Sequence, residues 1–82
     1  MVISAQVSIY PLRQEHLSPA IEALSDALKS AGMSPEVGSM STMITGEANA
    51  VFAALYEGFV RAAATGHVVM AATFSNACPV RA

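Results

Sequence analysis

The order in which the hydrophobic periodicity changes along the chain is the feature that most constrains its fold. Both ends of the chain carry a period of two, over residues 2–10 and 67–75, and such alternation predicts strands with one apolar face. Because proline cannot donate to a sheet ladder, we expect Pro11 to end the first strand. The apolar positions are Ile3, Ala5, Val7 and Ile9 in the first strand and Val68, Met70, Ala72 and Phe74 in the last.

Helical periodicity lies between these strands, in two segments. In the first, residues 18–31, we expect Ser18 to cap the N-terminus, Pro19 to take the first helical position and Gly32 to provide a left-handed stop. The predicted buried stripe of this helix is Leu17, Ile21, Leu24 and Leu28.

The second helical segment covers residues 48–66, with Asn49 or Glu47 at its start and Gly66 at its end. Gly58 lies in the middle of this helix, where glycine costs about 1 kcal/mol relative to alanine. We interpret it as a mark of close packing. The predicted buried stripe is Phe52, Leu55, Phe59 and Ala62 or Ala63.

Two short strands are predicted between the helices, at about Glu36–Ser39 and Ser41–Gly46, joined tightly near Met40. The order of elements is then β-α-β-β-α-β. This order predicts an α+β ferredoxin-like sandwich, in which two helices cover one face of a four-stranded antiparallel sheet. We expect residues 1–82 to form this single domain.

The composition is too apolar for a small monomer that meets water on all sides. Hydrophobic residues make up 54% of the 82 residues and charged residues only 12%. A chain of this length buries only about 60–65% of its unfolded surface. No apolar run approaches the roughly 20 residues of a membrane-spanning helix, and the N-terminal stretch lacks the basic start of a signal peptide. We therefore expect a homo-oligomer without membrane insertion.

The sheet face that the helices leave open is predicted to be uncharged. A face that meets water normally carries charge. A neutral face suits a surface covered by another subunit, or one that lines a ligand groove; a plain, weakly solvated sheet is the alternative. The expected outward positions are Ser4, Gln6, Ser8, Tyr10, Ser41, Met43, Thr45, Val69, Ala71, Thr73 and Ser75.

Charge and residue types argue against several classes of function. Four scattered basic residues on a chain of net charge −2 argue against nucleic acid, because phosphates require clustered Lys and Arg. The single cysteine, Cys78, excludes an internal disulfide and fits a reducing, cytoplasmic compartment. Two histidines without ligand spacing predict no metal site. His67 lies too far along a straight strand to serve Cys78 as a base, and His16 approaches it only if the loop tips converge, so we expect no catalytic residue.

Four stretches of the chain, taken in order, resemble a known family. They are VSIYP at 7–11, STMITGE at 41–47, AVFAALYEGFVRAA at 50–63 and HVVMAATFSNACP at 67–79. Together they are similar to a repeat of the YkoF family, the thiamine/hydroxymethylpyrimidine-binding proteins. The resemblance implies a non-enzymatic protein, without a cofactor, that binds thiamine or its hydroxymethylpyrimidine precursor and supports uptake or salvage of that precursor. Family members carry two repeats and this chain one, so it also implies self-assembly, as a dimer or tetramer.

The resemblance also implies a set of ligand-binding residues, namely Ser8, Tyr10, Ser41, Thr42, Ser75 and Cys78. To these we add Asn76, whose amide can pair with the edge of a neutral aminopyrimidine. Glu47 is added because its carboxylate can offset the charge of a thiazolium. Two alternatives remain open: a small dimeric α+β enzyme of the isomerase or monooxygenase type, and a structural or regulatory oligomerisation module.

Overall fold

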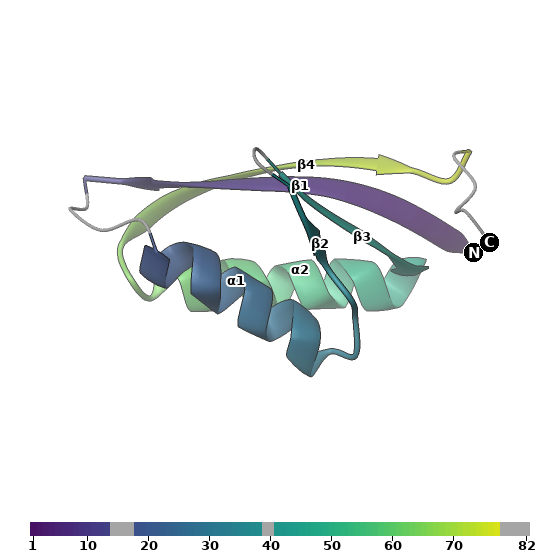
Figure 1. The fold of residues 1–82 in the computed structure, drawn as a ribbon, viewed down its shortest axis with the longest axis horizontal. Helices are drawn as coiled ribbons and strands as arrows, with labels where there is room; N and C mark the ends of the chain where they lie inside the picture. The colour runs from purple at the N-terminus through teal and green to yellow at the C-terminus, as the bar shows by residue number, and fades with distance from the viewer. Residues whose placement is uncertain (14–17, 39–40, 78–82) are drawn as a thin grey trace.

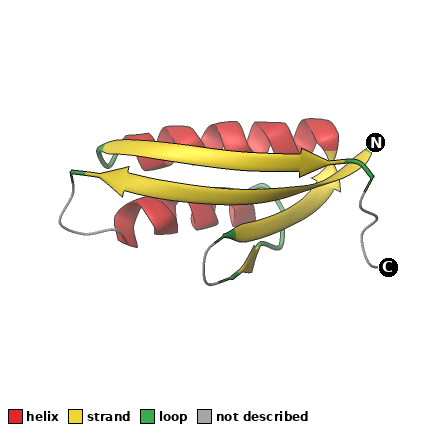
Figure 2. Cartoon of the chain, turned by 90° about the horizontal axis from the view of Figure 1, so that it is seen from above, coloured by secondary structure: helices red, strands yellow, loops and turns green. Residues whose placement is uncertain are grey.

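The computed structural model describes residues 1–13, 18–38 and 41–77. It contains β1 (Val2–Leu12), α1 (Ser18–Ser30), β2 (Glu36–Val37), β3 (Thr42–Glu47), α2 (Ala48–Ala63) and β4 (His67–Ser75). The strands form one antiparallel sheet in the order β2-β3-β1-β4. Both helices lie against the same face of this sheet (Figure 1), and the strands lie in front of the helices when the molecule is viewed from above (Figure 2). The predicted ferredoxin-like sandwich is confirmed.

The two faces of the sheet follow the alternation in the sequence. Ile3, Ala5 and Val7 are buried against the helices together with Ile44, which is the partner of Ala5 in β3. These side chains form one core with apolar residues of both helices, namely Leu24, Leu28, Val51, Ala54 and Leu55. The intervening residues of β1 therefore face away from the helices, as predicted.

The first strand continues through Pro11 to Leu12, so the prediction that Pro11 ends it is wrong. Pro11 is the partner of Val68 in β4, while the pairing of β1 with β3 reaches only Val7. A proline is tolerated in a strand where its missing N–H would point to an unpaired edge. At Pro11 the side of β1 that β3 occupies elsewhere carries no strand among the described residues.

Helix α1 ends as the sequence predicts. Gly32 has a φ of 83°, in the left-handed region that favours glycine. The N–H of Met33 donates to the carbonyl of Leu28 at 3.0 Å, and the N–H of Gly32 donates to that of Lys29. This pattern satisfies carbonyls that a helix end would otherwise leave without partners.

Helix α2 is rotated relative to the predicted stripe. Its buried residues are Val51, Ala54, Leu55, Gly58 and Ala62. Phe52 is 53% exposed and Phe59 39% exposed, so the prediction that both are buried is wrong. The physical reason is the close approach of the two helices. A Cβ added at Gly58 would lie 2.5 Å from Cδ1 of Leu24, which leaves room only for small α2 residues at the helix contact. The interpretation of Gly58 as a mark of close packing is confirmed.

Candidate functional site

A cavity of about 310 Å³ lies between β1, α1 and the β2–β3 hairpin. This volume is at the lower end of the range of about 300–1,000 Å³ that is typical of small-molecule sites. The described residues that line it are Val7, Ser8, Ile9, Tyr10, Ile21, Leu24, Ser25, Leu28, Val37, Gly38, Ser41 and Thr42.

The cavity exists because the strands differ in length. β1 has eleven residues, β3 six and β2 two. The hairpin turns back where the N–H of Gly38 donates to the carbonyl of Ser41 at 2.8 Å. β1 continues beyond this point, paired only with β4 among the described residues. The space beside it, which a longer β3 would fill, is closed from the helix side by α1.

The wall that α1 supplies is mostly apolar. Leu24 and Leu28 are buried, whereas Ile21 is 45% exposed because it faces the open cavity and not the closed core. The prediction that Ile21 belongs to the buried stripe is therefore wrong. Ser25 lies on the same side of the helix, and its hydroxyl on an otherwise apolar stripe is the sequence signal that could have indicated this wall.

The polar groups of the cavity are neutral. None of its described lining residues carries a carboxylate, an amine, a guanidinium, an imidazole or a thiol. Five of the lining residues carry a hydroxyl group, namely Ser8, Tyr10, Ser25, Ser41 and Thr42. The side-chain amide of Gln6 donates to Oγ of Ser41 at 3.1 Å, which leaves the proton of that hydroxyl available for donation to another group. Sequence reasoning did not include Gln6 or Ser25 in the site.

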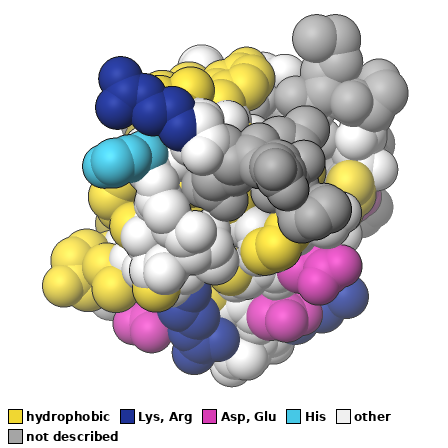
Figure 3. Space-filling model, turned by 90° about the vertical axis from the view of Figure 1, so that its left-hand side faces the viewer, with side chains coloured by type: hydrophobic (Ala, Val, Ile, Leu, Met, Phe, Trp, Pro, Cys, Tyr) yellow, Lys and Arg dark blue, Asp and Glu magenta, His cyan; other side chains and the backbone are white. Residues whose placement is uncertain are grey.

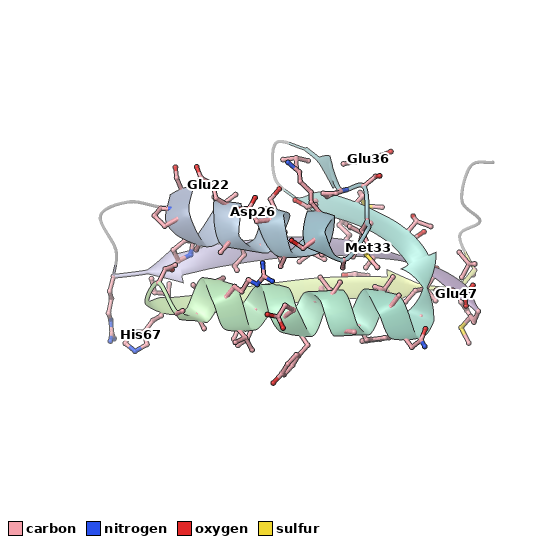
Figure 4. All side chains as sticks on the ribbon, turned by 90° about the horizontal axis from the view of Figure 1, so that it is seen from below. Glu22, Asp26, Met33, Glu36, Glu47 and His67 are labelled. Atoms are coloured by element: carbon pink, nitrogen blue, oxygen red, sulfur yellow. The ribbon has the colours of Figure 1, made fainter. Side chains whose placement is uncertain are left out.

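The acidic side chains of α1 do not alter this neutral character. Glu22 and Asp26 are exposed and lie on the side of α1 that faces away from α2 (Figure 4). At the end of the molecule seen in Figure 3, a cationic side chain lies beside a histidine. His67 is the partner of Leu12, and Arg13 follows Leu12 in the chain. None of these charged residues is among the described residues that line the cavity.

The structure divides the predicted ligand-binding residues into two groups. Ser8, Tyr10, Ser41 and Thr42 all line the cavity. Glu47 and Ser75 lie at the other end of β1, as the partners of Val2 and Ser4. Ser4 and Ser8 are four residues apart in an extended strand, which corresponds to about 13 Å. Within one protomer, a small ligand in the cavity does not reach the second group.

The second group makes local contacts of its own. Glu47 precedes α2 without a side-chain capping bond, and its Oε1 accepts from the ammonium of Met1 at 3.0 Å. Asn76 Nδ2 lies 3.9 Å from the sulfur of Met1, and the N–H of Ala77 donates to Oγ of Ser75 at 3.1 Å. Glu47 and His67 mark opposite ends of the molecule in Figure 4. Cys78 and His16 lie outside the described residues.

The open face of the sheet carries the neutral side chains that the sequence predicts. Ser4 Oγ and Thr45 Oγ1 are 3.3 Å apart across β1 and β3, and Gln6 is the partner of both Met43 and Thr73. Among the described residues, the carboxylates and the imidazole on this face lie at its rim. They are Glu36 on the edge strand β2, Glu47 at the end of β3 and His67 at the start of β4.

The model of the YKOF-related family matches residues 2–81. The chain belongs to this family. No match was found among curated proteins. Neither helix among the described residues has the length and hydropathy of a membrane span.

Solved structures similar to this YKOF-related protein share its fold at low sequence identity. A hypothetical protein, MJ1052, from Methanocaldococcus jannaschii has a TM-score of 0.84 and 20% identity, over 98% of this chain and 84% of that one. A candidate thiamine biosynthesis/salvage protein of Thermotoga maritima has a TM-score of 0.80 and 18% identity, over 90% of this chain and 82% of that one. A DUF77 domain from Bacillus cereus has a TM-score of 0.79 and 16% identity, over 90% and 74%.

Proposed function

We propose that this protein binds thiamine or its hydroxymethylpyrimidine precursor, without catalysis, in the cavity beside β1. The observation that carries the proposal is the chemistry of that cavity. It combines an apolar wall from α1 with neutral residues that carry hydroxyl groups, and no charged residue lines it among those described. A hydroxymethylpyrimidine is flat, neutral and edged with donors and acceptors, so it needs these groups and no counter-ion.

Membership of the YKOF-related family and the thiamine-related description of the Thermotoga maritima neighbour support the same ligand class. The cellular role that follows is uptake or salvage of a thiamine precursor in the cytoplasm. A lone cysteine is compatible with that reducing compartment.

Titration calorimetry with hydroxymethylpyrimidine, thiamine and thiamine diphosphate tests the proposal. We expect the first two to bind, and each to raise the apparent stability by about 2.7 kcal/mol at a hundredfold excess over Kd. No heat and no thermal shift with any of the three would contradict the proposed function. Conversion of either ligand during the titration, followed by chromatography, would contradict the non-enzymatic role.

The proposal includes a homo-oligomer, a dimer or tetramer, in which a second copy covers the open face of the sheet. The support is that the described residues at the centre of that face carry no charge and include half-exposed apolar side chains. These include Tyr10, Met43 and Val69. Charge-depleted, partly aromatic surfaces are characteristic of interface cores. Light scattering at micromolar concentration tests the assembly, and a monomer would contradict it.

A further inference from the structure

The hydrogen-bond pattern of the sheet determines which way the main chain of each β1 residue points. In an antiparallel ladder, successive residues direct their N–H and C=O groups alternately to the two neighbouring strands. The N–H of Ala48 donates to the carbonyl of Met1 at 2.9 Å, so Met1 directs its carbonyl toward the β3 side. With the continuous register from Val2↔Glu47 to Val7↔Thr42, the odd residues of β1 face β3 and the even residues face β4.

The hairpin gives the same answer independently. The N–H of Gly38 donates to Ser41, so Ser41 and Met43 direct their main chains to β2. Thr42 and Ile44 must then face β1, where they oppose Val7 and Ala5.

Ile9 is the next odd residue after β3 has ended. Its side chain packs against the core, and its main chain points to the side on which β1 has no strand partner among the described residues. Ile9 also lines the cavity, between Ser8 and Tyr10, whose side chains face the opposite way. The residue that follows in the same orientation is Pro11, which has no N–H to satisfy. Ile9 therefore brings one main-chain donor and one main-chain acceptor to the cavity.

We propose that the main chain of Ile9 forms two hydrogen bonds with the edge of the ligand, one donated by its N–H and one accepted by its C=O. This inference rests on the proposed function and specifies what the site recognises. A 4-aminopyrimidine offers a ring nitrogen that accepts and an adjacent amino group that donates, which is the complement of this pair. The flat ring then lies against the apolar side chains of Ile21, Leu24 and Leu28.

Pairing with the main chain of Ile9 predicts that the site distinguishes a 4-aminopyrimidine from its 4-oxo counterpart, which hydroxyl side chains alone would not do. The 4-oxo counterpart of the pyrimidine carries a donor on its ring nitrogen and an acceptor beside it, the reverse order. To satisfy both groups of Ile9, it has to turn over, which moves its 5-substituent to the other side of the ring. A site built from freely rotating hydroxyls accepts both compounds, because a hydroxyl can donate or accept. The N–H of Ile9 can only donate and its C=O can only accept, so these two groups distinguish the compounds.

The test uses 4-amino-5-hydroxymethyl-2-methylpyrimidine and its 4-oxo counterpart as probes. The 82-residue chain is prepared by chemical ligation with an ester in place of the amide N–H of Ile9, so that the side chain is unchanged. The matched control is Ile9→Val, which keeps the N–H. We expect the wild type and Ile9→Val to prefer the amino probe at least tenfold, about 1.4 kcal/mol. The ester variant should lose about tenfold in affinity for the amino probe and most of the preference.

A measurement on the unmodified protein keeps the inference testable if the ester variant does not fold. In ¹⁵N-edited NMR, the amide proton of Ile9 should shift downfield and exchange more slowly on saturation with the amino probe. An unmoved Ile9 amide, or an ester variant that keeps wild-type affinity and preference, would overturn the role of Ile9 while thiamine-related binding stands. Failure of the wild type to bind either probe, or thiamine, would overturn both proposals.

Discussion

The contact between Gly58 and Leu24 predicts that Gly58→Ala destabilises the protein, and that a smaller residue at position 24 turns this loss of stability into a gain. A Cβ at position 58 would lie 2.5 Å from Cδ1 of Leu24 and 3.7 Å from Cβ of Ala27. Alanine in place of glycine within a helix gains about 1 kcal/mol, whereas overpacking a filled core costs about 1–3 kcal/mol. We therefore expect Gly58→Ala to lower the free energy of unfolding by about 1 kcal/mol, with a lower melting temperature by about 4–8 °C for a domain of this size.

The clash involves one methyl group, so removing that group should reverse the effect. Leu24→Val lacks Cδ1 and by itself should cost about 1 kcal/mol, as other losses of one buried methylene do. In the Leu24→Val background, Gly58→Ala should stabilise the protein by about 1 kcal/mol, since only the helix propensity remains. Urea unfolding of the four proteins at one fixed protein concentration measures the coupling. If Gly58→Ala destabilises both backgrounds equally, the helix contact does not limit the size of residue 58.

The same substitution should weaken ligand binding, because Leu24 lines the cavity and the displaced methyl group moves away from α2 and toward it. We expect about a tenfold loss of affinity for hydroxymethylpyrimidine in Gly58→Ala, about 1.4 kcal/mol, recovered at least in part in the double variant. Unchanged affinity in Gly58→Ala would show that Leu24 yields in another direction.

Three further predictions address the assembly, the cavity hydroxyls and the form of the ligand. Thr73→Lys places an ammonium at the centre of the open face and should dissociate the oligomer, as measured by light scattering. The control Ala50→Lys, on the exposed helix surface, should leave the oligomer intact. If Thr73→Lys does not change the assembly, the interface lies elsewhere. Ser41→Ala should weaken thiamine binding about 2–13-fold for one lost hydrogen bond, while calorimetry on Thr45→Ala, at the other end of the sheet, should show no change. Thiamine diphosphate should bind at least tenfold more weakly than thiamine, because no described lining residue is cationic. Equal affinity for the two ligands would contradict this prediction and would indicate that Arg13 binds the phosphates. In that case Arg13→Gln should lower the affinity for thiamine diphosphate.

The faces of the strands could be predicted from the sequence because a period of two allows only two solutions. One hydrophobic alternation, from Ile3 to Ile9, separates the core side of β1 from its open side; Ile3, Ala5 and Val7 are buried, and Ile9 is partly buried and packed against the core. The rotation of α2 could not be predicted in this way. Its large side chains, Phe52 and Phe59, suggest a buried stripe, but the distance between two helices is set by the smallest residues between them. Here these are Ala54, Gly58 and Ala62.

The cavity was only partly accessible to sequence reasoning. The family resemblance indicated residues on one side of it, and the structure brings Ser8, Ser41 and Thr42 together there. The α1 wall and the main chain of Ile9 were missed. Both depend on where β3 stops beside β1, and strand ends are the least predictable property of a sheet. In the sequence, only Pro11 indicated where β3 stops beside β1, since a proline inside a strand marks an edge without a ladder partner.

Strand β1 leaves two of its surfaces uncovered, and they make different physical demands. Its open face presents side chains that gain most from the removal of area from water, which a second copy of the chain can provide over many residues at once. Its edge at Ile9, which has no strand partner among the described residues, presents a donor and an acceptor in fixed positions, and these gain only from a group that matches both. β4 pairs with β1 from Ser4 to Leu12, so the other edge is closed over that length. A protein that assembles through the face while the edge stays open to the cavity can therefore bind a small heterocycle in each copy, with assembly and recognition resting on different atoms of the same strand.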